Sequence, residues 1–508
     1  MLCVFYIEKN FKSRIVKNMS NKQLTKREEN FSQWYLDVIT AADLAEHGDV
    51  KGTMIIKPYG YAIWERLQRI LDDKIKETGH QNAYFPMFIP KSFFSKEAAH
   101  VSGFAKECAV VTHYRLKTDE KGELVVDPEA KLQEELIVRP TSETIIHSAF
   151  SRWIKSWRDL PILINQWANI VRWEMRTRLF LRTSEFLWQE GHTAHATEAE
   201  AEAEARKMLE VYKWLAQDIM AMPVIDGQKS EAEKFAGALR TYAIEAMMQD
   251  GKSLQAGTSH NLGQGFAKAF EVKFVDENNT QQYAWMTSWG VSTRLIGGLI
   301  MTHSDNKGLV LPPQLAPIQV VIIPIIKDDN SAKKVLEAVT KLKEDLQTAA
   351  VRVHVDSRDF ETMGNKMYEW EKKGVPLRIE IGPRDVENKQ VMLACRDQDK
   401  KSPLPLSGAV TAITDLLLDM QKSLFIKAQK RLTENSYNID NYSEFTKKVE
   451  NGGFFYAHWC GNAKCEEEIK QETKATIRCM PFAQKEEKGV CMKCNKDSKK
   501  RVIFARAY

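Results

Sequence analysis

Long hydrophobic runs are missing from the sequence. The apolar run nearest the start covers residues 2–7 and is followed at once by Glu8 and Lys9, which makes it too short for the core of a signal peptide. No other stretch approaches the roughly 18 apolar residues that a membrane-spanning helix requires. We therefore expect a soluble, cytoplasmic protein with no membrane partner. Residues 1–18 carry no core pattern, so Met1 and Met19 both stay open as the start residue.

Cysteine is scarce along most of the chain. Eight occur among 508 residues, and five of them fall between positions 460 and 494. Without a secretion signal, disulfide bonds are not expected, and clustering of this kind indicates a metal site.

Two common nucleotide-binding motifs are also absent. Gly251-Lys252-Ser253 is like the end of a P-loop, but the position that needs the earlier glycine is Ala246. Gly263-x-Gly265 lacks the third glycine of a dinucleotide fingerprint. There are no internal repeats, so repeat architectures are excluded as well.

Charge is unevenly distributed. Residues 427–508 hold 17 basic against 11 acidic side chains, whereas the rest of the chain holds 56 against 57. A polyanion such as RNA would favour that distribution, and a solvated basic surface would explain it equally well.

The length predicts about three domains at roughly 150 residues each. Pro312, Pro313 and Pro317 mark a linker. We divide the chain into an N-terminal tail (1–21), a first large domain (22–310), a second domain (316–425) and a cysteine-rich third domain (430–508).

The first large domain alternates helical patterns with short β-rich runs. Amphipathic spacing predicts a helix over 61–76, and an Ala/Glu-rich stretch predicts another from Thr197 to about Met220. We expect strands at 82–89, 162–173, 180–188, 270–275, 283–288 and 299–303.

The second domain has a βαβ rhythm. A β-branched run at 319–326 precedes a helix at 332–349, and a final helix is expected at 409–427. Shorter strands are expected at 351–355, 377–381 and 390–394. The fold class is therefore α/β, with an α+β first domain.

The spacing of the clustered cysteines indicates which ones bind metal. Cys460-x4-Cys465 and Cys491-x2-Cys494 form two pairs about 25 residues apart. Four thiolates with no open position suit a structural Zn²⁺ ion. Cys479 lies away from both pairs, and we expect it to be packed in the interior.

Arginine recurs in an order that suits an anionic ligand. Arg172 ends one predicted strand, Arg182 begins the next, and Arg294 follows a turn at 288–293. Guanidinium groups on two adjacent strands can hold a carboxylate and a polyphosphate by bidentate hydrogen bonds. Each arginine alone is more often a surface residue, so only their joint occurrence is informative.

The segments around these arginines resemble the three motifs of class II aminoacyl-tRNA synthetases. Residues 52–86 resemble motif 1, residues 172–186 with Arg172-x-Glu174 resemble motif 2, and Gly290-x-x-x-Arg294 resembles motif 3. Three longer strings resemble prolyl-tRNA synthetases in particular: Arg139-Pro-Thr-Ser-Glu143, Phe186-Leu-Trp-Gln-Glu-Gly-His192 and Gln255-Ala-Gly-Thr-Ser-His260. The likeness runs from about Phe31 to Tyr508.

The resemblance implies a fold and an activity. The fold would be an antiparallel class II catalytic sheet with flanking helices, an α/β anticodon-binding domain and a small zinc-binding domain. The activity would be ATP-dependent formation of prolyl-adenylate from L-proline, followed by transfer to tRNA(Pro). ATP would be used with Mg²⁺, in part held by Gln255.

The resemblance also assigns residues. Arg172, Glu174 and Arg294 would be catalytic, mainly by positioning and by stabilising charge. The proline pocket would comprise Phe104, Thr141, Glu143, Arg172, Trp188, His192, Thr258 and His260. ATP would contact Arg172, Glu174, Arg182, Thr183, Phe186, Gln255, Thr258, Ser292 and Arg294, with adenine between Phe186 and Arg294. From the residues alone, ordinary packed histidines would be the preferred interpretation of His192 and His260.

In the second domain, the family pattern places anticodon contacts at Glu371, Arg378 and Arg384. Guanidinium groups read guanine edges well. Residues 316–425 hold 17 basic and 17 acidic side chains, so binding would depend on local placement.

Two features indicate a subtype. About 65 residues separate Glu190 from Gln255, too few for the editing insertion of many bacterial members, so a separate editing protein is expected to clear mischarged tRNA. The zinc domain and the terminal Tyr508 resemble the archaeal/eukaryote-like subtype, in which that tyrosine packs toward the active site. Motif 1 implies a homodimer.

Three other interpretations remain. The chain could be a class II synthetase for another amino acid, a catalytically silent tRNA-binding paralogue, or, judged from the cysteine segment alone, a nucleic-acid-binding ribbon.

Overall fold

The computed structural model describes residues 24–95, 107–326 and 328–508. Phe104 therefore lies outside the described residues, as do Met1 and Met19. None of the helices within these ranges is both long and apolar enough to cross a membrane.

An eleven-stranded sheet organises the larger part of the molecule, with the order β22-β23-β27-β24-β11-β12-β13-β16-β10-β9-β3. Its central strands are antiparallel neighbours. They are β9 (Ile162–Val171), β10 (Glu185–His195), β11 (Val224–Gln228), β12 (Arg240–Met247), β13 (Ser253–Gly263) and β16 (Trp285–Ser292). The expected antiparallel sheet is confirmed.

Helices cover one face of this sheet and bury a single large core. They are α2 (Phe31–Ala41), α3 (Pro58–Glu77), α7 (Glu198–Trp214) and α9 (Arg294–His303). Both helices predicted in this region are confirmed. Thr197 caps α7 by accepting from the backbone N–H of Glu200, whose carboxylate accepts in return; a π-helical turn at Leu215–Ile219 follows.

Several strand predictions were wrong in instructive ways. The strand expected at 299–303 is the end of α9, in which residues 295–303 are all buried. When a helix is buried on all sides, its sequence is apolar at nearly every position, so the hydrophobic pattern does not distinguish a helix from a strand. The stretch 82–89 is extended only at its ends, as β3 (Gln81–Asn82) and β4 (Phe88–Pro90). The strand expected at 180–188 begins at Glu185, so the loop before it is longer than predicted. The strand expected at 270–275 begins only at Lys273, as β14 (Lys273–Val275), and that expected at 283–288 is divided between β15 (Gln281–Tyr283) and β16.

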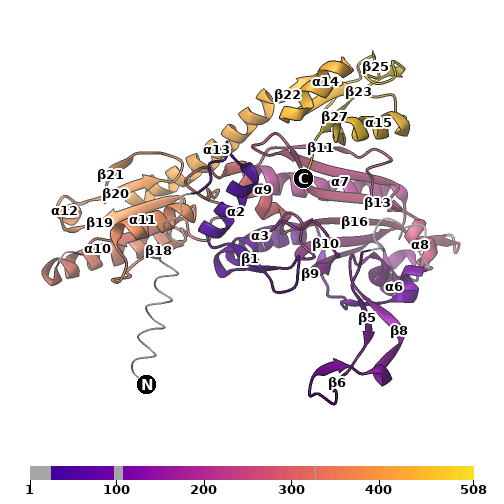
Figure 1. Cartoon of the computed structure of the whole chain (residues 1–508), viewed down its shortest axis with the longest axis horizontal. Coiled ribbons are helices and arrows are strands. Elements are labelled where there is room, and N and C mark those ends of the chain that lie inside the picture. The colour runs from indigo at the N-terminus through magenta and orange to yellow at the C-terminus, as the bar shows by residue number, and fades with distance from the viewer. Residues whose placement is uncertain (1–23, 96–106, 327) are drawn as a thin grey trace.

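A separate five-stranded sheet forms the second part, with the order β18-β17-β19-β20-β21. Its strands are β17 (Val320–Pro324), β18 (Val353–Val355), β19 (Leu377–Ile381), β20 (Gln390–Cys395) and β21 (Lys401–Pro405). The helices include α10 (Asp329–Thr348), α11 (Met363–Lys372) and α12 (Pro383–Glu387). The predicted βαβ rhythm is confirmed. Helix α13 (Ala409–Glu434) is longer than expected and leads to the C-terminal part (Figure 1).

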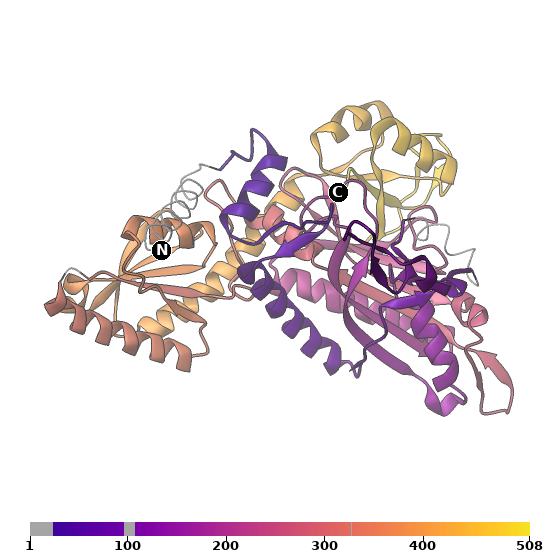
Figure 2. The ribbon, with the colours of Figure 1, turned by 60° about the horizontal axis from the view of Figure 1, so that its bottom comes forward.

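The C-terminal part extends the large sheet. Its strands are β22 (Ser436–Asn438), β23 (Phe454–His458), β24 (Thr476–Pro481) and β27 (Arg501–Ala505), accompanied by α14 (Tyr442–Lys448) and α15 (Ala463–Thr473). Gly227 and Gln228 of β11 pair with Pro481 and Met480 of β24. Figure 2 shows this part, in yellow, against the body of the large sheet, with the five-stranded part at the opposite end.

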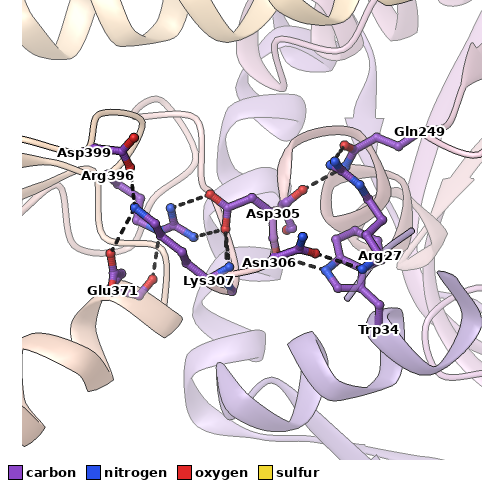
Figure 3. Close-up of polar contacts among 11 residues, drawn as sticks. Arg27, Trp34, Gln249, Asp305, Asn306, Lys307, Glu371, Arg396 and Asp399 are labelled. Atoms are coloured by element: carbon purple, nitrogen blue, oxygen red, sulfur yellow. Dashed lines mark hydrogen bonds and ion pairs between the residues drawn. The ribbon is translucent and has the colours of Figure 1, made fainter. Parts of the chain in front are cut away.

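A polar cluster around Asp305, just beyond α9, links the two sheets (Figure 3). The Asp305 carboxylate accepts two bonds from the guanidinium of Arg396, at 2.6 and 2.9 Å. Its carbonyl accepts from the Trp34 indole at 2.9 Å. Arg396 also donates to the carbonyl of Glu371 at 2.9 Å. The end of α9 is thereby fixed to both α2 and α11.

We expect Asp305→Asn to lower stability by about 1–2 kcal/mol, because it weakens a charge-assisted pair to the buried Arg396. Burial raises the pKa of Asp305, but Arg396 and nearby backbone N–H groups outweigh it and hold the pKa below its ordinary value. The stabilisation is therefore present above the unfolded pKa and is lost as pH falls through the folded one. Thermal melting from pH 7 downward should show the wild-type advantage shrink below about pH 4.

The matched control is Asp399→Asn, because Asp399 pairs with Lys307 but is 88% exposed. It should change melting little. Equal effects of the two substitutions, or a difference that does not vary with pH, would contradict the assignment.

Candidate active site

A cavity of about 520 Å³ opens on the face of the large sheet opposite α7. Its floor is formed by β10, β16 and β13, whose side chains alternate between the two faces. Along β16, the side chains of Trp289 and Val291 belong to the core that α7 covers, and Ser288, Gly290 and Ser292 occupy the alternate positions. All five residues contribute to the cavity lining.

The strand register brings the predicted site residues into rows across the floor. Gly290 lies between Glu190 and Thr258, and in the next row Ser288 lies between His192 and His260. A Cβ at Gly290 would meet only the Gln189 carbonyl at 3.0 Å and atoms at 3.9 Å or beyond. The absence of a side chain there keeps the middle of the cavity open.

Glu190 is the most strongly held acidic group in the cavity. Its carboxylate accepts from Ser142 Oγ at 2.5 Å and from Gln166 Nε2 at 2.8 Å, and it contacts His192 Nε2 at 3.0 Å. Burial raises the pKa of Glu190, but these three partners outweigh it and hold the pKa below its ordinary value. A buried, ionised carboxylate therefore borders the cavity.

Sequence reasoning assigned no role to Glu190, although it lies within the string Phe186–His192. The missed signal was its position two residues before His192 on a strand, which places both side chains on the same face.

A second carboxylate, Glu143, lies at the start of α6 (Glu143–Trp153). Thr141 donates a short hydrogen bond to it, and both residues line the cavity. The positive end of the helix dipole stabilises an anion at this position. Two carboxylates on one side of the cavity favour a cationic ligand group.

The pKa values of the two buried histidines in the cavity, His192 and His260, are shifted in opposite directions. Burial lowers the pKa of His192, but the bond and charge of Glu190 outweigh it and raise that pKa above its ordinary value. Burial lowers the pKa of His260 to about 3, so that ring is neutral. It packs against Phe235 with the ring centroids 4.7 Å apart and the planes tilted by 34°. Within the described residues His192 Nδ1 and Ser288 Oγ, both buried, have no hydrogen-bond partner, which leaves them available to a ligand.

Arg172 follows directly after β9 and also lines the cavity. Its Nε donates to the Pro140 carbonyl at 2.8 Å, and its guanidinium carbon lies 5.6 Å from the Phe186 ring and 5.4 Å from Trp188. Burial lowers its pKa to about 10, so it remains charged at neutral pH.

Arg294, the first residue of α9, also lines the cavity. Its backbone N–H donates to Ser292 Oγ and its Nε to the Leu181 carbonyl, both at 3.2 Å. Phe186 and Gln255 also line the cavity. The cavity is thus lined by carboxylates and guanidinium groups together, and Arg172 is close enough to be affected by the charges of Glu143, Glu190 and Arg294.

Three residues expected to contact ATP do not line this cavity. Glu174 and Arg182 form an ion pair at 3.7 Å in the loop before β10, and Thr183 is buried and donates to the Glu185 carbonyl at 2.7 Å. Because β10 begins at Glu185, these residues lie on a long loop and not on a strand. Their ATP contacts stay predictions.

One wall of the cavity was not anticipated from sequence at all. It is formed by the loop between β11 and β12, from which residues 232–236 line the cavity. No motif marks this loop, and neither flanking strand was predicted.

A second cavity, of about 280 Å³, lies beside the five-stranded sheet. Glu371 and Arg378 line it, together with Trp370 and Lys401. Arg384 lies on α12 and does not line this cavity. Two of the three residues expected to contact the anticodon are therefore brought together.

The last residue of the chain reaches the large sheet. The Tyr508 N–H donates to the Ser253 carbonyl at 3.1 Å and its hydroxyl donates to Asp250 at 2.6 Å. Ser253 is two positions before Gln255 on β13, and Gln255 lines the cavity, so Tyr508 lies near that part of the cavity lining.

Four cysteines in the C-terminal part form the expected cluster. The sulfurs of Cys460, Cys465, Cys491 and Cys494 all lie within 4.8 Å of one another, with Cys460 at 3.8 Å from Cys465 and 3.6 Å from Cys494. Sulfurs bound tetrahedrally at 2.3 Å from Zn²⁺ would be about 3.8 Å apart, so the cluster fits zinc. Cys479 is fully buried in a separate apolar cluster on β24, as expected.

Comparison with protein families identifies the class. Residues 124–303 match the class II core domain of tRNA synthetases (G, H, P, S and T), residues 319–416 match an anticodon binding domain, and residues 442–508 match the prolyl-tRNA synthetase C-terminal family.

Individual relatives narrow this class to one family. Proline–tRNA ligases from Porphyromonas gingivalis and Parabacteroides distasonis are 59% and 60% identical, each over 96% of this chain and 99% of the relative. A crystal structure of prolyl-tRNA synthetase from Cryptosporidium parvum, complexed with L-proline and AMP, superposes with a TM-score of 0.88 at 41% identity, covering 96% of this chain and 97% of that one. The chain belongs to the prolyl-tRNA synthetase family.

We expect Gly290→Val to abolish amino-acid activation with little loss of fold, because its side chain would occupy the space between Glu190 and Thr258. ATP–pyrophosphate exchange measures the activity, and circular dichroism reports the fold. Gly364→Val is the control, since a Cβ there meets nothing within 4 Å. Normal exchange in Gly290→Val would show that the ligand does not lie over this glycine.

Proposed function

We propose that this chain activates L-proline with ATP and transfers it to tRNA(Pro). The observation that carries the proposal is that charges of both signs line the main cavity: the carboxylates Glu143 and Glu190, and the guanidinium groups of Arg172 and Arg294. An amino acid presents a cation and a carboxylate a few ångströms apart, and this cavity offers partners for both.

In this proposal, Thr141 and Glu143 accept the two N–H bonds of the prolinium nitrogen. Trp188 and His192 border the pyrrolidine ring, Thr258 and His260 close the pocket, and Phe104 contributes to its wall. The neutral state of His260 supports this placement, since a second positive charge beside prolinium would be unfavourable.

The chemistry requires no protein nucleophile. Arg172 holds the proline carboxylate and the α-phosphate together and stabilises the charge that develops as the carboxylate attacks the phosphorus and pyrophosphate leaves. Phe186 and Arg294 sandwich adenine, while Ser292, Glu174, Arg182 and Thr183 complete the ATP site. The loop that carries the last three would then close onto the nucleotide.

We further propose that Mg²⁺ accompanies ATP and is held in part by Gln255. Gln255 lines the cavity, as Arg172 and Arg294 do, and its amide oxygen is a ligand type that this hard cation accepts. When bound, the ion neutralises phosphate charge.

The five-stranded domain, about 316–425, would read the anticodon through Glu371, Arg378 and Arg384. Glu371 and Arg378 share a cavity, which suits an unstacked base. The first domain, about 22–310, would hold the catalytic site, and 430–508 would be the zinc-binding domain.

Several finer features follow the same proposal. In this proposal the chain is of the archaeal/eukaryote-like subtype and acts in the cytoplasm. A separate protein edits mischarged tRNA, because the chain has no editing insertion. Residues 191–254, where such an insertion would lie, are occupied mainly by α7, β11 and β12, which supports this part of the proposal. The chain forms a homodimer through the motif 1 segment, where Ile55, Tyr61 and Tyr84 are 47%, 41% and 73% exposed.

ATP–pyrophosphate exchange with each amino acid in turn tests the activity. We expect exchange with proline, and Arg172→Ala should reduce it by roughly 100-fold or more, the scale for removing a transition-state donor. Arg158→Ala is the control, since Arg158 is exposed on the surface. Exchange with no amino acid would favour the silent paralogue, and exchange with threonine alone would overturn the specificity.

We also propose that the four-cysteine cluster binds one structural Zn²⁺ ion. Elemental analysis should find about one zinc per chain, and Cys491→Ser should lose it because three thiolates remain. Cys479→Ser is the matched control and should retain zinc. Equal metal loss in both variants would contradict the assignment.

A further inference from the structure

The loop at residues 229–239, between β11 and β12, forms a wall of the main cavity and covers His260. The ring of Phe235 in this loop packs against the His260 ring, tilted to it and with the centroids 4.7 Å apart, and residues 232–236 line the cavity. The loop has turns but no helix or strand of its own. Its position therefore depends on contacts with other parts of the chain.

The first of these contacts is a buried ionic cluster at the base of the loop. Lys229 Nζ lies 2.7 Å from a Glu245 carboxylate oxygen, and Arg478 donates to both oxygens of the same carboxylate at 3.1 Å. The Lys229 and Glu245 side chains are 1% and 0% exposed. Arg478 belongs to β24 of the C-terminal part, so this part supplies half of the compensating charge.

The second set of contacts comes from α15. Ser230 Oγ donates to the Glu466 carboxylate at 2.5 Å, and both residues are almost completely buried, at 1% and 4% exposure. Three residues further along the loop, Glu233 lies 3.5 Å from Lys470 Nζ. Successive turns of one helix thus hold successive positions of the loop.

Helix α15 is itself fixed at the cysteine cluster. Cys465 lies in its first turn, directly before Glu466, and Cys460 lies in the turn that precedes the helix. An ion held by these thiolates would fix the start of α15, and with it the carboxylate that receives Ser230.

We propose that Glu466 and Lys470 are positioning residues for amino-acid binding. Through these two residues, helix α15 of the C-terminal part holds the 229–239 loop over the proline pocket. The zinc cluster in turn fixes the position at which α15 begins. The inference deepens the proposed function and depends on it for the identity of the ligand. It assigns the cysteine-rich part a role in substrate affinity rather than in the chemical step, because neither residue lines the cavity.

The experiment compares full-length variants on one helix. We expect Glu466→Ala to raise the KM for proline about tenfold, the effect of losing one buried charge-assisted bond, with kcat changed by less than twofold. Glu466→Gln should restore the KM, because an amide oxygen still accepts from Ser230. Glu472→Ala is the matched control, since the polar partners of Glu472 among the described residues are Tyr442 and Lys493 of the same part.

Hydrogen exchange of residues 229–239 provides a readout independent of activity. It should accelerate in Glu466→Ala and in the zinc-free Cys491→Ser variant, and should be unchanged in Glu472→Ala and Glu466→Gln. Unchanged loop protection in Glu466→Ala, or a loss of kcat at constant KM, would overturn the inference. If the wild-type chain failed to activate proline, the proposed function would fall, whereas the loop measurement would still decide whether α15 holds this wall.

Discussion

Glu190 lies opposite Gly290, and Gly290 lies opposite Thr258, because β10, β16 and β13 pair in one particular register. A shift of one residue in either pairing would turn these groups into the helix-covered core and bring Trp289 and Val291 into the cavity. The register is held by apolar packing on the far face, where Trp289 packs beside Tyr212 of α7. The chemistry of one face is thus specified by the hydrophobic residues of the other.

Glu143 and Glu190 act electrostatically on Arg172 across the cavity lining, so direct contacts must fix how each of these charged groups is oriented. Glu190 is satisfied by Ser142, Gln166 and His192, and Arg172 is fixed by the Pro140 carbonyl and two aromatic rings. Each charge is therefore oriented by neutral or local partners before any ligand arrives. Such preorganisation avoids part of the cost of ordering the site on binding.

The sequence predicted those features that depend on local pattern. Four cysteines at metal spacing, the amphipathic helix at 61–76 and the βαβ rhythm after the proline linker all follow from spacing and periodicity, and family strings located most residues of the main cavity. Sequence could not reveal that Arg182 and Thr183 lie on a loop, because where β10 begins depends on its pairing with β9. The 229–239 wall was missed because contacts such as Ser230 with Glu466 join residues far apart in the chain.

The pairing of β11 with β24 joins segments that are synthesised far apart in time, which affects how the large sheet can be completed. β11 ends at Gln228, whereas its partner strand begins at Thr476, so roughly half of the chain must leave the ribosome before this edge of the sheet is covered. Until then the nascent protein carries an open strand edge of the kind that favours wrong pairing. The last contacts to form also include the one at Tyr508, beside β13. A chain that lacked the C-terminal part would therefore contain every arginine and carboxylate of the cavity. It would still lack α15 and β24, which hold the 229–239 loop that forms one wall of the cavity.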